Sequence, residues 1–210
     1  MGEIFKTEQE EFWAGQFGDD YIGRNSGDAL VGSNISLLGK MLSRCQNAMS
    51  LIEFGANIGM NLRAIRALRP EMELDAIEIN AKAVDELRAW DGADEIFHGS
   101  ILDFTAGRTW DIALIKGVLI HVNPDFLPQV YESLVRASNR YILIAEYYNP
   151  TPIEIVYRGH SGRLFKRDFA GEMLDRFPNL RVVDYGFVWR RDPVFPQDDA
   201  TWFVLEKIIL

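Results

Sequence analysis

The sequence predicts one α/β domain: a mostly parallel sheet of seven strands, with helices on both faces and an antiparallel hairpin at its end. From about residue 48 onward, short apolar runs alternate with amphipathic helical segments, which is the pattern of parallel βαβ units. In the last 30 residues, two strand-like runs follow each other without a helix between them. A chain of 210 residues, 48% of them hydrophobic, is long and apolar enough for one packed core.

The expected strands are short apolar runs bounded by turn residues. They cover residues 50–54, 74–79, 95–98, 111–116, 140–146, 181–189 and 201–209. Because the first five alternate with helices, we expect them to pair in parallel, and the last two to close the sheet as the antiparallel hairpin.

The expected helices lie where apolar residues recur every three or four positions. Pro70 ends the helix that begins near Met60, and Asn80 is a suitable N-cap for the second. Pro128 fits the first turn of the third helix, and the fourth begins near Asp168. Each helix therefore has a start or stop signal of its own.

The charge balance argues against two classes of partner. The chain has 22 Lys and Arg against 31 Asp and Glu, a net charge of −9, which disfavours nucleic acid and anionic membranes. A single cysteine, Cys45, excludes an internal disulfide framework, and the three histidines lack metal-ligand spacing, so no metal site is expected. Without a basic leader or a stretch of about 18 apolar residues, we expect a soluble, cytoplasmic protein.

The turn after the first expected strand is the most informative segment. It has the pattern Glu53-x-Gly55-x-Asn57-x-Gly59 and opens a helix, whose first amides can accept a ligand. A dinucleotide fingerprint needs glycine where Asn57 and Met60 stand, so that fingerprint is missing. A carboxylate at this strand end suits a ligand with an ammonium group and would repel a pyrophosphate. The other interpretation is a structural βα turn without a ligand.

A second acidic residue strengthens the ligand-binding interpretation. Glu78, which precedes Ile79 at the end of the second expected strand, lies 19 residues after Gly59. This is close to the spacing of about 20 residues at which a carboxylate reaches a ribose hydroxyl pair. A solvated acidic residue at a strand end is the alternative. Together with the turn, Glu78 indicates an adenosine-type ligand.

At these residues the sequence resembles the class I S-adenosylmethionine-dependent methyltransferase superfamily, over roughly residues 48–209. The resemblance rests on EFGANIG (53–59), IEIN (77–80), HGSILDF (98–104), WDIALIKGVLIHV (110–122) and the terminal hairpin. More narrowly, the chain resembles methylases associated with pseudaminic acid biosynthesis. That resemblance rests on EEFWAGQFGDDYIGRN, NRYILIAEYYNPTP, YRGHSGRLFKRDFAGEM and RDPVFPQDDATWF.

The resemblance implies a Rossmann-like fold, S-adenosyl-L-methionine as cofactor, S-adenosyl-L-homocysteine as product, and a set of cofactor-binding positions. In this sequence the set comprises Glu53, Gly55, Asn57 and Gly59 near the methionine and ribose, Glu78 and Ile79 at the ribose, Ser100 and Ile101 at the adenine, and Lys116 and Gly117 at the methionyl part. Two positions depart from the family pattern: Asn57 replaces a glycine, and Ser100 replaces an acidic residue for which Asp103 is a possible substitute.

Two residues are candidates for catalysis. His121 follows the fourth expected strand by five residues, and an ordinary histidine pKa of about 6.5 suits a base at neutral pH. Its alternative role is packing against the cofactor. Glu146 ends the fifth expected strand, where it either accepts a proton or holds a substrate group, or else bonds to loop backbone.

A basic segment at residues 156–167, expected as a loop, is the predicted acceptor site. It holds four cations and no acidic residue within a chain of net charge −9, which suits an acceptor with a carboxylate or phosphate. The alternative is a solvated loop whose cations pair with acidic neighbours. The predicted substrate residues are Tyr147, Tyr148, Tyr157, Arg158, His160, Lys166 and Arg167, and residues 190–201 are a further possible wall.

Residues 1–47 are expected to form a helical cap or lid ahead of the methyltransferase domain at residues 48–210. Tyr21 and Arg24 are predicted cofactor contacts that, with Asn25, close over the site; the alternative is a helix that only covers one edge.

The predicted activity is methyl transfer to a small, anionic acceptor, and the family resemblance implies that this acceptor is a sugar or nucleotide-sugar of surface-polysaccharide biosynthesis. Another small-molecule acceptor, an amino-acid-like compound or a natural product, stays open, as do O- against N-methylation and the oligomeric state. A nicotinamide-dependent oxidoreductase would need the missing Gly-x-Gly-x-x-Gly turn. A non-catalytic binding or scaffold protein of the same fold would be expected to have lost Glu53, Gly55, Gly59 or Glu78, and all four are present.

Overall fold

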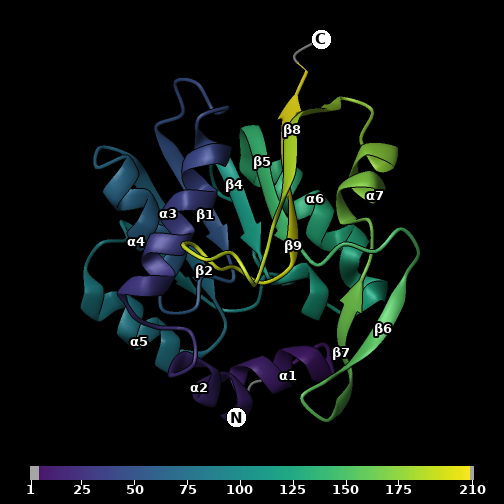
Figure 1. Ribbon diagram of the computed structural model, residues 1–210. Helices are drawn as coiled ribbons and strands as arrows, with labels where there is room; N and C mark the ends of the chain where they lie inside the picture. Colours follow the sequence, from purple (N-terminus) through teal and green to yellow (C-terminus); the bar gives the residue numbers. More distant parts are fainter. Residues whose placement is uncertain (1–4, 209–210) are drawn as a thin grey trace.

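The computed structural model describes residues 5–208. Its centre is a seven-stranded sheet in the order β3-β2-β1-β4-β5-β9-β8 (Figure 1). The pairs from β3 to β5 are parallel, whereas β9 runs antiparallel to both β5 and β8. The strands are β1 (Ser50–Phe54), β2 (Glu73–Glu78), β3 (Glu95–His98), β4 (Trp110–Lys116), β5 (Ser138–Glu146), β8 (Leu180–Val188) and β9 (Ala200–Lys207). This confirms the predicted Rossmann-like, mostly parallel sheet with its antiparallel hairpin.

Helices cover both faces of the sheet, as predicted. Figure 1 shows α3, α4 and α5 on one side and α6 and α7 on the other. Their bounds are α3 (Asp28–Leu42), α4 (Met60–Leu68), α5 (Ala81–Trp90), α6 (Leu127–Ala137) and α7 (Phe169–Arg176), and two short 3-10 helices, η1 (Leu119–His121) and η2 (Pro124–Phe126), follow β4. A hydrophobic core lies on each face of the sheet, and neighbouring residues of a strand point into different cores. Leu143 of β5 packs in the same core as Leu62 of α4, and Ile142 packs in the same core as Val130 of α6.

The structure differs from the prediction at the basic segment. Residues expected as a loop form a separate two-stranded sheet of β6 (Ile153–Tyr157) and β7 (His160–Lys166). The turn between them places Arg158 at φ 49° and Gly159 at φ 87°, the left-handed conformation that two-residue hairpin turns require. Arginine is uncommon at the first position of such a turn, where asparagine, aspartate or glycine is usual, so the sequence did not indicate a hairpin. At the other end of the chain, the last residue of the expected strand 201–209 lies outside the described residues.

Two short helices, α1 (Glu8–Ala14) and α2 (Gln16–Ile22), lie beneath the carboxyl ends of the central strands (Figure 1). A capping box of Thr7 and Glu10 begins α1. The β6–β7 hairpin holds α1 in place, because Gln9 Nε2 donates to the Gly162 carbonyl at 2.8 Å and Arg163 pairs with Glu8 at 3.2 Å.

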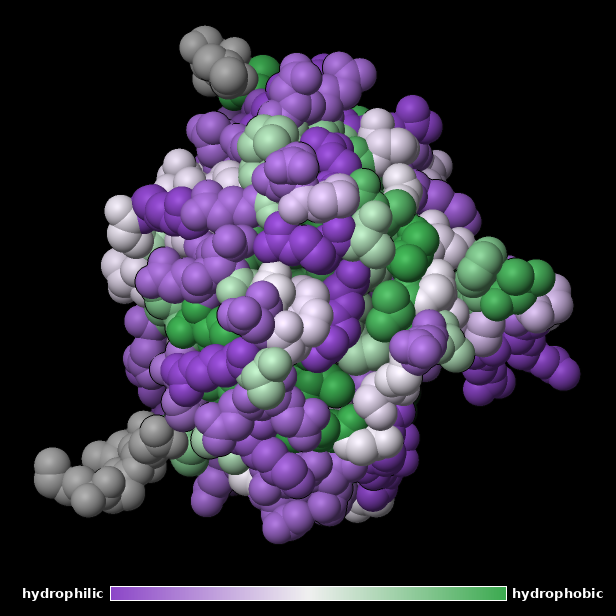
Figure 2. Space-filling view, turned by 90° about the vertical axis from the view of Figure 1, so that its left-hand side faces the viewer, coloured by the Kyte–Doolittle hydropathy of each residue, from purple (hydrophilic) through white to green (hydrophobic). Residues whose placement is uncertain are grey.

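The face in Figure 2 is mainly hydrophilic, with hydrophobic residues gathered towards its right-hand edge.

Among the described residues, no helix has the length and apolar character needed to cross a membrane.

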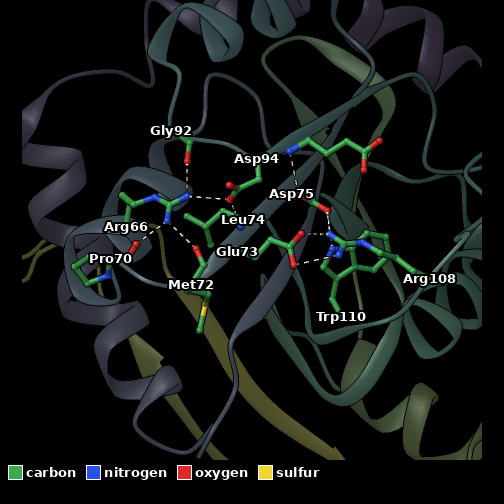
Figure 3. A network of polar contacts seen from close by, with 11 residues as sticks. Arg66, Pro70, Met72, Glu73, Leu74, Asp75, Gly92, Asp94, Arg108 and Trp110 are labelled. Carbon is green, nitrogen blue, oxygen red and sulfur yellow. Dashed lines mark hydrogen bonds and ion pairs between the residues drawn. The ribbon is translucent and has the colours of Figure 1, made fainter.

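A buried carboxylate links the amino ends of three strands (Figure 3). Asp75, fully buried in β2, accepts hydrogen bonds from Trp110 Nε1 at 2.7 Å and from the Glu95 amide at 3.0 Å, and it pairs with Arg108, which also pairs with Glu73. This network lies at the opposite end of the strands from α1 and α2. We therefore assign this network a structural role, because it joins the amino ends of the strands and lies away from α1 and α2.

We expect Asp75→Ala to lower the free energy of unfolding by about 2–4 kcal/mol, because it leaves the buried Trp110 Nε1 and the part-buried Glu95 amide without their acceptor. Urea denaturation measures the change. Asp85→Ala is the control: Asp85 is 79% exposed and its ion pair with Arg88 spans 3.9 Å, so the expected change is below about 0.5 kcal/mol. Equal effects of the two substitutions would contradict a structural role for the network.

Candidate active site

A cavity of about 410 Å³ lies at the carboxyl ends of β1, β2 and β4. Its wall combines the turn after β1, the ends of β2 and β4, the segment after β3, helices α1 to α3 and the connection between β8 and β9. In open α/β sheets, ligands bind at this end of the strands. The predicted cofactor positions that line the cavity are Tyr21, Gly55, Asn57, Glu78, Ile79, Ser100, Ile101, Lys116 and Gly117.

The backbone explains the residues of the first turn. Gly55 has φ 76°, and a Cβ there would approach a side-chain carbon of Val118 to 2.6 Å. Gly59 has φ 79° and lies against Leu87, where a Cβ would meet a carbon at 2.5 Å, so it packs α4 on α5 and is not part of the cavity wall. Asn57, which stands where the resembled methyltransferase pattern has a glycine, has φ 50°. Asparagine tolerates this conformation better than most residues, which explains the departure.

Glu78 is held at the cavity wall by backbone donors. Its two carboxylate oxygens accept from the amides of Asn57 at 2.7 Å and Asn80 at 2.8 Å. Burial raises the pKa of Glu78, while these hydrogen bonds favour the charged form. The carboxylate therefore has a fixed orientation between the glycine turn and the start of α5.

Glu53 is fully buried beside the cavity rather than in its wall. Asn61, which lines the cavity, donates to Glu53 Oε1 at 2.6 Å. Among the described side chains, Glu53 Oε2 and Asn61 Oδ1 are buried acceptors without a hydrogen-bond partner. Burial raises the pKa of Glu53 to about 8, and the Asn61 bond and the charge of Lys116 limit the rise. This arrangement suits a cationic group that donates hydrogen bonds.

The segment after β3 meets an acidic residue from α1. The Ser100 hydroxyl donates to the carboxylate of Glu10, and both residues line the cavity. Asp103, the substitute considered from the sequence, pairs with Lys6 at 2.5 Å and is 61% exposed outside the cavity wall. Sequence reasoning missed Glu10, because 90 residues separate it from Ser100.

The two predicted catalytic residues have different surroundings. His121 lines the cavity, and its Nδ1 lies 2.6 Å from the Arg163 carbonyl. A carbonyl only accepts, so Nδ1 carries the proton and Nε2 the lone pair. Burial lowers the pKa of His121 to about 4. Glu146 lies outside the wall and accepts from the amides of Val118 and Leu119, each at 2.9 Å; burial raises its pKa to about 7. Glu146 thus fixes the segment that carries His121.

None of the seven predicted substrate residues is part of the cavity wall. Arg167 pairs with Glu172 at 2.6 Å, Lys166 lies over the Tyr147 ring, and Arg158 over the Tyr157 ring. Tyr148 is 44% exposed. His160 packs against Phe12 and Phe17, and Tyr157 packs against His121 and Phe17. The hairpin therefore lies beside the cavity and contacts its wall through His121 as well as through α1 and α2.

A different wall closes the cavity near Lys116. Gln197, in the connection from β8 to β9, donates from Nε2 to Asn34 Oδ1 of α3 at 2.8 Å. Both residues line the cavity, together with Asp198 and Arg190. Burial and the nearby charge of Asp198 raise the pKa of Tyr147, while burial lowers that of Lys116. The sequence pointed to residues 190–201 only as a possible wall, and it gave no sign of Asn34, which lies 163 residues from Gln197.

Helices α1 and α2 supply an aromatic part of the wall. Trp13 and Tyr21 line the cavity, with ring centroids 5.0 Å apart, and Trp13 also contacts the His121 ring at 4.6 Å. Arg24 lies over the rings of Tyr21 and Phe17 and not in the wall, whereas Asn25 lines the cavity. Within residues 5–208, no group of three or more His, Cys, Asp or Glu side chains is placed to hold a metal ion.

Comparisons with known proteins show the fold. No protein-family model and no curated protein sequence matches the chain. Among solved structures, magnesium protoporphyrin IX methyltransferase (ChlM) from Synechocystis PCC 6803 with bound S-adenosylhomocysteine has a TM-score of 0.70 at 12% identity, over 97% of this chain and 100% of that one.

Two further structures have similar scores. The plantazolicin methyltransferase BpumL has a TM-score of 0.66 at 12% identity over 96% of this chain and 94% of that one. DesVI from Streptomyces venezuelae has a TM-score of 0.63 at 12% identity over 98% and 100%. The chain therefore has the fold of class I S-adenosylmethionine-dependent methyltransferases.

Proposed function

We propose that the protein is a methyltransferase that uses S-adenosyl-L-methionine and acts on a small-molecule acceptor. The observation that carries this proposal is the fixed Glu78 carboxylate, which faces the same cavity as the turn after β1. A carboxylate held by two backbone amides at this place suits the two hydroxyls of a ribose.

The remaining wall fits the other parts of the cofactor. The unpartnered acceptors Glu53 Oε2 and Asn61 Oδ1 would suit the ammonium group of the methionyl part, and Lys116, which lines the cavity, would hold its carboxylate. At the opposite end, the Glu10 carboxylate beside Ser100 offers an acceptor for the amino group of adenine.

When bound, the cofactor's sulfonium supplies an activated methyl group, and the chain positions the acceptor in line with it and excludes water. His121 is neutral at neutral pH with its lone pair on Nε2, so it can accept a hydrogen bond from the acceptor, but a pKa of about 4 makes it a weaker base than the sequence predicts. Glu146, held by backbone amides, orients the segment that carries His121. Helices α1 and α2 act as the lid that shields the reacting atoms.

For the acceptor, we propose an anionic sugar or nucleotide-sugar of the pseudaminic acid type. The resemblance of the sequence to methylases of that pathway supports this, as does the presence of Asn34, Gln197 and Arg190 in the cavity wall. Amide side chains hydrogen-bond sugar hydroxyls, and an arginine suits a carboxylate or phosphate.

The test of the acceptor is a transfer assay with methyl-labelled S-adenosylmethionine. The panel holds nonulosonic acids, free and as cytidine monophosphate esters, together with uncharged free monosaccharides and amino-acid-like compounds. We expect labelled product from an acidic sugar. Transfer only to neutral sugars, or to amino-acid-like compounds, would contradict the proposed acceptor while leaving methyl transfer intact.

A further inference from the structure

Asn80 connects three parts of the site through separate atoms. Its backbone amide donates to Glu78 Oε1 at 2.8 Å, and its side-chain Oδ1 caps α5 by accepting from the Ala83 amide at 2.9 Å. Its side-chain Nδ2 points to the amino-terminal helices, where it donates to Asp19 Oδ1 at 2.9 Å and to the Trp13 carbonyl at 3.2 Å. Asn80 is 2% exposed, so these bonds form away from bulk water.

Where α2 meets Asn80 and α1, there is no room for a residue larger than glycine at position 18. A Cβ at Gly18 would lie 2.8 Å from Asn80 Nδ2 and 1.9 Å from the Trp13 carbonyl oxygen. Gly18 has an ordinary helical position in α2, so space and not backbone conformation demands glycine here. Helices α1 and α2 therefore approach Asn80 as closely as the backbone allows.

The two helices supply part of the cavity wall through Glu10, Trp13 and Tyr21. The residue that orients the Glu78 carboxylate through its backbone thus holds this wall through its side chain. We propose that Asn80 is a positioning residue, which ties α1 and α2 to the ribose-binding carboxylate so that the wall is in place when the cofactor binds. This inference rests on the proposed function.

Asn80→Ser removes the side-chain hydrogen bonds from Asn80 to α1 and α2 and keeps its other interactions. Serine is also a good N-cap and keeps the backbone bond to Glu78, but it lacks the Nδ2 donor. Gly18→Ala disturbs the same contact from the other side. The controls are Asp168→Ser, at the N-cap of α7 away from the cavity, and Gly23→Ala, where a Cβ would meet nothing within 4 Å.

The experiment measures S-adenosylhomocysteine affinity and dissociation rate, amide hydrogen exchange of residues 8–22 in the ligand-free protein, and the urea midpoint. For Asn80→Ser and Gly18→Ala we expect about tenfold weaker binding through faster dissociation, and faster exchange in α1 and α2. We expect a lower urea midpoint for Asn80→Ser than for Asp168→Ser, because Asn80→Ser also loses the Nδ2 hydrogen bonds to Asp19 and to the Trp13 carbonyl. Both controls should bind like the wild type.

Wild-type affinity in Asn80→Ser, or weaker binding without faster exchange in α1 and α2, would overturn the inference. If the wild-type protein binds no S-adenosylhomocysteine, the proposed function fails. The contact of Asn80 with α1 and α2 is then tested by amide hydrogen exchange of residues 8–22 alone. Unchanged exchange in Asn80→Ser would overturn the inference, and faster exchange would support it.

Discussion

Glu78→Gln is expected to weaken S-adenosylhomocysteine binding by about 100-fold or more. Hydrogen bonds to a charged acceptor contribute about 1.5–3 kcal/mol each, and a ribose offers two hydroxyl donors. Glutamine also brings an NH₂ group against one of the two amides, of Asn57 or Asn80, that donate to the carboxylate. Isothermal titration calorimetry of the purified variant measures the loss.

The matched control is Glu95→Gln, an exposed glutamate at the amino end of β3 outside the cavity wall. It removes the same charge and is expected to bind like the wild type. If Glu78→Gln and Glu95→Gln bind equally well, Glu78 does not hold the ribose.

The second large effect is a pH dependence that comes from Glu53. Its pKa is raised to about 8 in the ligand-free protein, so near neutral pH the carboxyl group is mostly protonated. A ligand ammonium group favours the ionised form, so binding releases a proton. We expect affinity to increase by up to about tenfold per pH unit between about pH 6 and pH 8 and then to level off. Calorimetry in buffers of different ionisation heat counts the released proton, and a flat affinity profile would contradict this role.

The raised pKa of Glu53 also affects folding: as the pH rises, the ligand-free protein becomes less stable, whereas ligand binding becomes tighter. Because the folded-state pKa lies above the ordinary value of 4.5, the contribution of Glu53 to stability is complete below about pH 4.5 and is lost as the pH rises through about 8. Glu53→Gln should therefore raise the free energy of unfolding of the ligand-free protein at pH 8, by on the order of 2–4 kcal/mol, and bind ligand more weakly without pH dependence. Loss of stability in this variant at pH 8 would contradict the account.

The sheet and half of the candidate site follow from local sequence patterns. Alternating apolar runs determine the strands, and the turn from Glu53 to Gly59 and the position of Glu78 follow from spacing within one βαβ unit. The remaining wall depends on contacts between distant segments. Glu10 meets Ser100 across 90 residues, and Asn34 meets Gln197 across 163, and no local pattern indicates either pair.

The basic segment shows the same limit. Its composition predicts a charged surface, but charge alone does not fix which side chains face the cavity. The turn at Arg158 folds the segment into a hairpin, and Arg167 pairs with Glu172. The acceptor site is consequently proposed at Asn34, Gln197 and Arg190, in the wall formed by α3 and the β8–β9 connection.

The most direct test of the central claim is calorimetry of the wild-type protein with S-adenosylhomocysteine, with NAD as the comparison ligand. We expect one site per chain with micromolar or tighter affinity for S-adenosylhomocysteine and no binding of NAD. No heat of binding with S-adenosylhomocysteine at high micromolar concentration, or preferential binding of NAD, would contradict it.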